Sequence, residues 1–207
     1  MANPKCAIIY YSSTGTTYKL AQAIQEGVAE AGAETRLLKV KELAPEAAIA
    51  SNAGWSAHRQ ETQAVPEASL EDLEWADILL FGTPTRYGLP SAQLKQFMDM
   101  TGPLWAKGKL VNKVASAFTS AATAHGGQEA TLLAIYHTFF HWGCIVVTPA
   151  YADPIQFQAG NPYGASFTSN NGALPPDGTA LAAARFQGRR VAEVARQFLA
   201  GRVPVGA

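Results

Sequence analysis

Five short apolar runs recur along the chain, and a longer segment of mixed polarity follows each of them. The runs are 6–11 (CAIIYY), 34–40 (ETRLLKV), 78–81 (ILLF), 114–118 (VASAF) and 144–147 (CIVV). A continuous apolar run is typical of a parallel strand that is buried on both faces. The second run is more polar than the others, so we expect that strand nearer an edge of the sheet.

The segments between these runs predict helices and two long loops. Apolar residues recur at helical spacing from Tyr18 to Val28, and Gly32 ends that helix. Further helices are expected near 70–73, 91–100, 126–142 and 180–200. Strands that alternate with helices predict an α/β fold, a doubly wound five-stranded parallel sheet with helices on both faces. We expect one domain, 1–207, with long insertions near 45–69 and 150–179.

Charge and cysteine content narrow the class of protein. Lys plus Arg equals Asp plus Glu, 16 each, so the chain lacks the basic surplus that nucleic-acid binding requires. The two cysteines, Cys6 and Cys144, lie inside apolar runs, which is typical of reduced thiols in a cytoplasmic protein. The first apolar run is too short to span a membrane, and no signal-peptide cleavage pattern follows it. We therefore expect neither membrane insertion nor a nucleic-acid partner.

A hydroxyl-rich loop follows the first predicted strand. In a doubly wound sheet, ligands bind beyond the carboxyl ends of the strands. A strand-to-helix loop there offers backbone N–H groups and the positive end of a helix dipole to a phosphate. The loop consists of Ser12, Ser13, Thr14, Gly15, Thr16 and Thr17. The motifs of dinucleotide-binding and P-loop proteins are absent, and an ordinary N-capped helix remains the alternative to phosphate binding.

Four further segments sharpen this interpretation. They are Gly82-Thr83-Pro84-Thr85-Arg86-Tyr87-Gly88, Thr101-Gly102-Pro103-Leu104-Trp105, His125-Gly126-Gly127-Gln128-Glu129 and Pro162-Tyr163-Gly164-Ala165. With the spacing Ser12-x-Thr14-Gly15-x-Thr17, they resemble the WrbA family of flavodoxin-like proteins, the type IV NAD(P)H:quinone oxidoreductases. The resemblance covers nearly the whole chain.

The resemblance implies a fold, an activity and an assembly. It implies strand order 2-1-3-4-5, one FMN per subunit, a homotetramer, and two-electron transfer from NADH or NADPH to a quinone. Because both substrates would use the same space over the flavin, we expect ping-pong kinetics. The quinone and the preferred nicotinamide cofactor stay open.

The resemblance also assigns the site residues. It implies that the cofactor is held by Ser12, Ser13, Thr14, Gly15, Thr16, Thr17, Pro84, Thr85, Arg86, Tyr87, Ser120, Ala121, Ala122, Thr123, Gly126 and His141. Trp105 is expected to stack on the substrate, and His141 to lie near it as a proton source. Ala121, Ala122 and Ala124 stand where relatives often carry Thr or Gly, and Trp142 stands where a second His is often found.

The predicted helix at 126–142 carries two histidines and an apolar surface almost all round. His137 and His141 share a face, but no third ligand is near in sequence, so we expect no metal site. A helix without a polar face is normally buried on both sides. Because a sheet covers only one side, this pattern favours a subunit interface.

Three other functions remain open from the sequence. A flavodoxin-like electron carrier usually has a strongly acidic face, and this chain is neutral. A regulatory or scaffold protein that associates with a repressor is suggested by the history of the family name. A reductase that releases free FMN would lose flavin on dilution.

Overall fold

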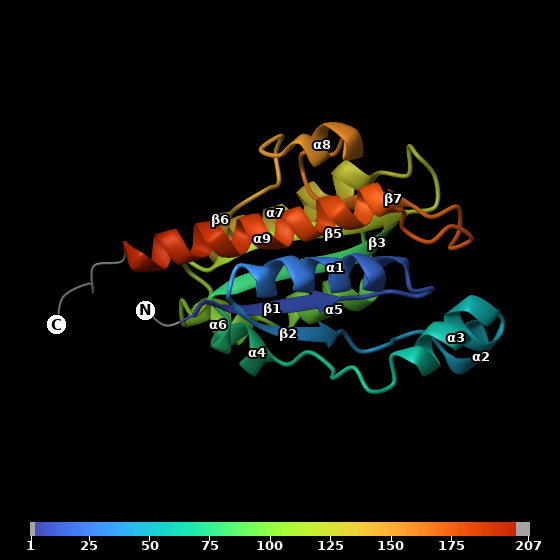
Figure 1. Cartoon of the computed structure of the whole chain (residues 1–207). Helices are drawn as coiled ribbons and strands as arrows, with labels where there is room; N and C mark the ends of the chain where they lie inside the picture. Colours follow the sequence, from blue (N-terminus) through green and yellow to red (C-terminus); the bar gives the residue numbers. More distant parts are fainter. Residues whose placement is uncertain (1–2, 202–207) are drawn as a thin grey trace.

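The chain folds around one central sheet (Figure 1). The computed structural model describes residues 3–201. The main path of the sheet is β2-β1-β3-β5-β6, and each neighbouring pair on it is parallel. Its members are β1 (Lys5–Tyr10), β2 (Glu34–Lys39), β3 (Ile78–Arg86), β5 (Val114–Ala121) and β6 (Ile145–Val146). The predicted doubly wound α/β fold is therefore confirmed.

The predicted count of five strands is wrong, because the sheet has seven in the described residues. The additional strands are β4 (Leu89–Pro90), antiparallel to β3, and β7 (Ser166–Thr168), parallel to β5. Each has only two or three residues, too few to give a periodic signal. The predicted strands at 78–81 and 114–118 correspond to β3 and β5, which extend beyond these apolar runs. Thr83 and Pro84 of β3 pair with Thr119 and Ser120 of β5.

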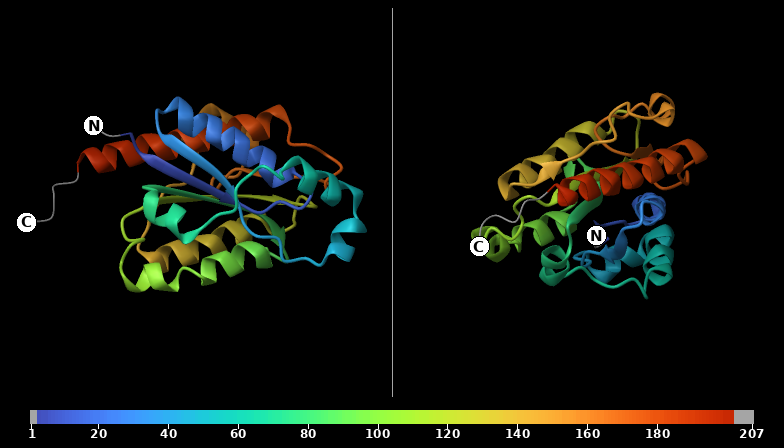
Figure 2. Two further views of the ribbon diagram at one scale, coloured as in Figure 1. Left: turned by 90° about the horizontal axis from the view of Figure 1, so that it is seen from below. Right: turned by 60° about the vertical axis from the view of Figure 1, so that its left-hand side comes forward.

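Helices cover both faces of the sheet (Figure 2). Successive strand residues point to opposite faces, so Cys6 and Ile8 pack under α1 (Thr16–Glu30) and α9 (Gly178–Ala200). Ala7 and Ile9 face the other layer. That layer consists of α4 (Leu70–Trp75), α5 (Ala92–Asp99), α6 (Gly102–Ala106) and α7 (Gln128–Trp142).

The contact between α1 and α9 is a close approach of two backbones. A Cβ atom placed on Gly27 would lie 1.9 Å from the carbonyl oxygen of Arg185, and one placed on Gly188 would lie 2.2 Å from that of Ile24. Side chains normally keep helix axes about 8–10 Å apart. The two glycines therefore allow the helices to pack more closely than larger residues would.

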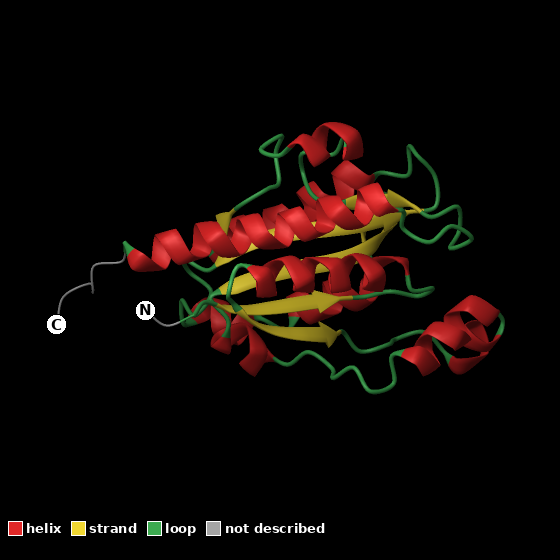
Figure 3. Ribbon diagram, in the orientation of Figure 1, coloured by secondary structure: helices red, strands yellow, loops and turns green. Residues whose placement is uncertain are grey.

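The two long insertions contain secondary structure that the sequence pattern did not predict. Segment 45–69 forms α2 (Glu46–Ala50) and α3 (Ala53–Glu61). Segment 150–179 contains α8 (Pro154–Ala159) as well as β7. Figure 3 shows the strands as arrows that point toward α2 and α3, so these two helices lie beyond the carboxyl ends of β1 and β2. The described chain begins and ends at the opposite edge of the sheet (Figure 1).

One side of α7 faces the sheet and the other is exposed in the single chain. Ile135 and Phe139 are fully buried, whereas Leu133 and Phe140 are exposed. The expected burial on both sides is thus not reached within one chain, and the subunit interface stays a prediction. None of the helices in residues 3–201 combines the length and the hydropathy that crossing a bilayer requires.

Candidate functional site

A crevice of about 730 Å³ opens at the carboxyl ends of β1, β3 and β5. Most of the residues that the sequence assigned to the cofactor line it. They are Ser12, Ser13, Thr14, Thr16, Thr17, Pro84, Thr85, Arg86, Tyr87, Ser120, Ala121, Ala122, Thr123 and Gly126. Three loops far apart in the sequence therefore meet around one space, as the order of the strands requires.

The loop between β1 and α1 has the geometry of an anion site. Gly15 is the N-cap of α1 and has φ +93°, a left-handed conformation that glycine adopts at little cost. No side chain caps the first turn, and the first N–H groups of a helix have no intrahelical acceptor. The Gly15 amide donates to Ser12 Oγ (3.0 Å), which fixes the turn. Uncapped amides and the surrounding hydroxyls fit a phosphate dianion, although the loop itself contains no lysine or arginine.

Two hydroxyl contacts join the phosphate loop to the end of β5, and the end of β3 to the loop that follows β5. Thr17 Oγ1 and Ser120 Oγ are 2.9 Å apart and buried. Thr85 Oγ1 donates to the carbonyl of Gly126 (3.2 Å). Gly127 approaches Gly88 so closely that a Cβ atom would lie 2.8 Å from the Gly88 Cα. The loops after β3 and β5 thus form a joined wall that suits a flat ring.

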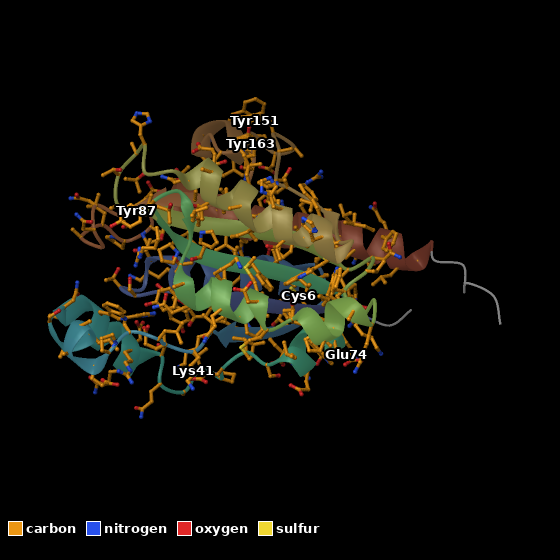
Figure 4. The ribbon with its side chains drawn as sticks, turned by 180° about the vertical axis from the view of Figure 1, so that it is seen from behind. Cys6, Lys41, Glu74, Tyr87, Tyr151 and Tyr163 are labelled. Atoms are coloured by element: carbon orange, nitrogen blue, oxygen red, sulfur yellow. The ribbon has the colours of Figure 1, made fainter. Side chains whose placement is uncertain are left out.

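Arg86 and Tyr87 lie at the mouth of the crevice. Arg86 Nη1 donates to its neighbour's carbonyl, that of Thr85 (3.1 Å), and Nη2 donates to Ser13 Oγ (3.4 Å). Tyr87 has φ +55° and its side chain is fully exposed. Figure 4 shows Tyr87 projecting from the end of the molecule, whereas Cys6 lies well inside it. A left-handed tyrosine is uncommon, and here it holds an aromatic ring out at the edge of the site.

The sequence interpretation missed the remaining walls of the crevice. These are Asn52 and Trp55 at the start of α3, and Ser169, Asn171 and Gly172 after β7. A Cβ atom on Gly172 would lie 2.7 Å from Thr14 Oγ1, so this turn touches the phosphate loop. Asn170, Asn171 and Gly172 all have positive φ. An Asn-Asn-Gly run favours such a turn, and this signal was available in the sequence.

His58 of α3 packs against the phosphate loop. It is 5% exposed, and its Nδ1 would lie 3.3 Å from a Cβ atom on Gly15. The same nitrogen is 3.1 Å from Glu61 Oε2. Burial lowers the pKa of His58 and outweighs the opposing effect of Glu61; the charges of Lys39 and Lys19 lower it further.

We predict that His58 makes stability depend on pH. Because its pKa is lower in the folded state than in the unfolded state, where it is about 6.5, the unfolded chain takes up the proton first. The contribution is complete above about pH 6.5 and is lost as the pH falls. Each kcal/mol lost lowers Tm by about 2–4 °C in a chain of this size. Between pH 7.5 and 5.5 the Tm of the wild type should fall more than that of His58→Gln, whereas the exposed-site control His137→Gln should follow the wild type.

Trp105 and His141 come together, but not at the crevice. Trp105 Nε1 donates to the carbonyl of His141 (3.0 Å). His141 lies near the C-terminal end of α7, whose first residue, Gln128, follows the crevice loop. At 1.5 Å per residue, His141 is about 20 Å along the helix from that loop. Within one chain, neither residue reaches the place that the resemblance implied.

The other histidines and the cysteines belong to no candidate metal site in residues 3–201. His125 and His137 are exposed. No group of three or more His, Cys, Asp or Glu side chains in this part of the chain could hold a metal ion. Cys6 and Cys144 are free thiols, and burial raises the pKa of both.

Comparison with known proteins places the chain in a family. Residues 4–158 match the NADPH-dependent FMN reductase family. The chain belongs to this family. It is 46% identical over 196 residues to the NAD(P)H dehydrogenase (quinone) of Deinococcus radiodurans, covering 94% of this chain and 97% of the relative. The protein of that name from Sinorhizobium fredii is 45% identical over 200 residues, covering 94% and 98%.

A solved structure supports the WrbA type within the FMN reductase family. The flavodoxin WrbA-like protein of Agrobacterium tumefaciens has a TM-score of 0.64 and 26% identity, covering 94% of this chain and 99% of that one. The resemblance inferred from the sequence and the flavodoxin-like fold are thereby confirmed. As expected from the sequence, this is a family of oxidoreductases whose members work with FMN and NAD(P)H.

Proposed function

We propose that the protein reduces quinones with electrons from NAD(P)H at an FMN held in the crevice. One observation carries this proposal: the uncapped, hydroxyl-rich start of α1 faces the joined loops after β3 and β5 across a single space. A phosphate at one end and a flat ring at the other match these two parts. FMN, when bound, supplies the hydride acceptance from NAD(P)H and the hydride donation to the quinone.

The residues of the chain bind and orient. Thr14, Thr16 and the amides of the first turn would hold the phosphate, and Thr17 is fixed by Ser120. Pro84 to Tyr87, Ala121 to Thr123 and Gly126 would lie along the ring. Ala121 and Ala122 present methyl groups, so contacts to the polar edge of the ring would come from the backbone there. Because one open space lies above both loops, donor and quinone would occupy it in turn.

The assembly is part of the proposal. Trp105 and His141 are joined at the far end of α7, so they can take part in the site only if a second copy brings them to the crevice. The exposed apolar side chains Leu133 and Phe140 on α7 are suited to such a contact. We propose a homotetramer, as the resemblance implies, working in the cytoplasm with its thiols reduced.

A visible spectrum tests the proposal directly. We expect purified protein to bind added FMN, NADH to bleach the flavin bands without oxygen, and benzoquinone to restore them. Double-reciprocal plots at several quinone concentrations should be parallel, and intersecting lines would contradict the shared space. An electron carrier would bind FMN without oxidising NADH. A protein that bound no FMN would refute the proposal as a whole.

A further inference from the structure

A second cavity, of about 530 Å³, opens beside the crevice. We call it the α3 compartment. It lies between the carboxyl ends of β1 and β2 and the helices α2 and α3, which stand apart at one end of the molecule (Figure 1). Ser12 and Trp55 line both the crevice and the α3 compartment. A ligand can therefore extend from one into the other, past the side chain of Trp55.

Trp55 is a fixed aromatic wall. Its Nε1 donates to Glu42 Oε2 (3.1 Å), and the Glu42 carboxylate also accepts from Tyr11 Oη (3.0 Å) and Gln93 Nε2 (2.8 Å). Burial alone would raise the pKa of Glu42, but the hydrogen bonds from Gln93, Tyr11 and two backbone amides together lower it. The carboxylate thus stays ionised and holds the indole in place. A fixed ring of this kind is suited to stacking on a planar base.

Tyr10 adds a polar group that has no partner. It lines the α3 compartment and is 1% exposed. Its hydroxyl has no hydrogen-bond partner among residues 3–201. Buried hydroxyls are nearly always paired, so this one is suited to a ligand that carries its own hydrogen-bonding groups. The α3 compartment therefore combines an aromatic wall with an unused polar contact.

Arg86 lines the crevice, and its charge reaches the neighbouring α3 compartment. Its guanidinium reaches Ser13 (3.4 Å) from the loop that would face the ring, and its charge is close enough to lower the pKa of Tyr11 against the larger effect of burial. Tyr11 lines the α3 compartment. Within residues 3–201 Arg86 forms no ion pair with a carboxylate. A guanidinium in this position is suited to the two charges of a pyrophosphate.

We infer that the α3 compartment binds the adenosine half of the nicotinamide dinucleotide, stacked on Trp55, while Arg86 contacts the pyrophosphate. This inference rests on the proposed function, because it places the rest of a donor whose nicotinamide lies over the flavin. A dinucleotide has a base at each end and a charged link between them, which matches two adjoining cavities with Arg86 in the lining of the first.

The charges of the α3 compartment select the donor. Its lining has three carboxylates, Glu42, Glu46 and Glu67, and two cations, Lys39 and Arg59. Both cations are engaged: Lys39 Nζ donates to the Thr62 carbonyl (2.6 Å), and Arg59 Nη1 pairs with Glu46 Oε2 (2.6 Å). The lining still has one more carboxylate than it has cations, so the 2′-phosphate of NADPH would meet a net negative charge. The structure therefore assigns a preference for NADH.

Replacing Trp55 tests the stacking contact. Titration calorimetry with ADP-ribose on the FMN-loaded protein should give a Kd about tenfold higher in Trp55→Ala than in the wild type. The kcat/KM for NADH should fall to a similar extent, and severalfold more than that for reduced nicotinamide mononucleotide, which lacks the adenosine. Trp75→Ala is the control, because Trp75 is half-buried on α4, against Arg36 and away from both cavities.

A matched pair of variants tests the preference for NADH. Glu46→Gln releases Arg59 beside the α3 compartment, so the ratio of kcat/KM for NADPH to that for NADH should rise severalfold. Glu74→Gln removes a comparable exposed ion pair, with Lys109 (2.8 Å), outside both cavities, and should leave the ratio as in the wild type. If both variants give the wild-type ratio, the selection by charge is wrong.

The outcomes separate this inference from the proposed function. Loss of NADH and mononucleotide turnover to the same degree in Trp55→Ala, or loss of neither, would overturn the adenosine site and leave quinone reduction intact. A wild type that reduces no quinone with either donor would instead overturn the proposed function. In that case the ADP-ribose titration still decides whether the compartment binds adenosine.

Discussion

Replacing Gly15 by alanine is expected to weaken FMN binding about tenfold or more. The residue has φ +93°, and a left-handed alanine costs about 1–2 kcal/mol. Its methyl group would also lie 3.3 Å from His58 Nδ1. If the loop moves to relieve either strain, its amides turn away from the phosphate. Binding then loses at least one hydrogen bond to a charged group, which contributes about 1.5–3 kcal/mol. Quenching of FMN fluorescence on titration with apoprotein measures the Kd.

Gly32→Ala is the matched control for this substitution. Gly32 lies just after the same helix with φ +78°, and no atom lies within 4 Å of the position of its Cβ. It carries the same conformational cost at the end of α1 remote from the crevice. We expect a lower Tm and an unchanged Kd for FMN. Equal Kd values for the two glycine variants would mean that the loop geometry does not govern FMN binding.

Gly27→Ala is expected to lower the free energy of unfolding by about 3 kcal/mol, at the upper end of what overpacking costs. The added methyl carbon would lie 1.9 Å from a backbone carbonyl oxygen of α9. Backbone atoms cannot rotate away as a flexible side chain can, so the two helices must separate. That separation uncovers apolar surface of the layer formed by α1 and α9. Urea denaturation followed by circular dichroism measures the change.

Gly178 of α9, which lies outside the close contact of α1 with α9, is the control for Gly27→Ala. Gly178 is the first residue of α9 and has no atom within 4 Å of the position of its Cβ. Gly178→Ala should be neutral or should stabilise the protein by up to about 1 kcal/mol, because alanine favours the helix. A loss in Gly27→Ala no larger than the change in Gly178→Ala would show that the close approach contributes little to stability.

The main strands could be predicted because burial on both faces leaves a continuous apolar run. Ile8 and Ile9 of β1 are both fully buried, although they point to opposite layers. The segment 45–69 could not be predicted in the same way. Within α3 only His58 is buried, so the helix has no apolar stripe and no helical period. Its position depends on polar contacts, such as that of Trp55 with Glu42, which the linear pattern does not reveal.

The candidate site was predictable where a loop follows a strand directly. Strand order brings such loops together, and the residues expected at 12–17, 84–87, 120–123 and 126 accordingly meet at one crevice. Gly15 does not line the crevice itself but is the N-cap of α1 beside it. Trp55 and Asn171 come to the same space from long insertions, whose path depends on tertiary packing. Trp105 and His141 were expected at the ligand, but within one chain they meet near the C-terminal end of α7, away from the crevice. The sequence does not say which end of a helix lies near a ligand.

The ends of the described chain have a practical consequence for handling this protein. β1 begins and α9 ends at the edge of the sheet opposite the crevice and α3 (Figure 1). Attachment to an affinity resin or an electrode near the start of β1 or the end of α9 would leave the mouth of the crevice facing the solution. Oriented attachment of this kind would let dissolved NAD(P)H and quinones reach the flavin without passing the support.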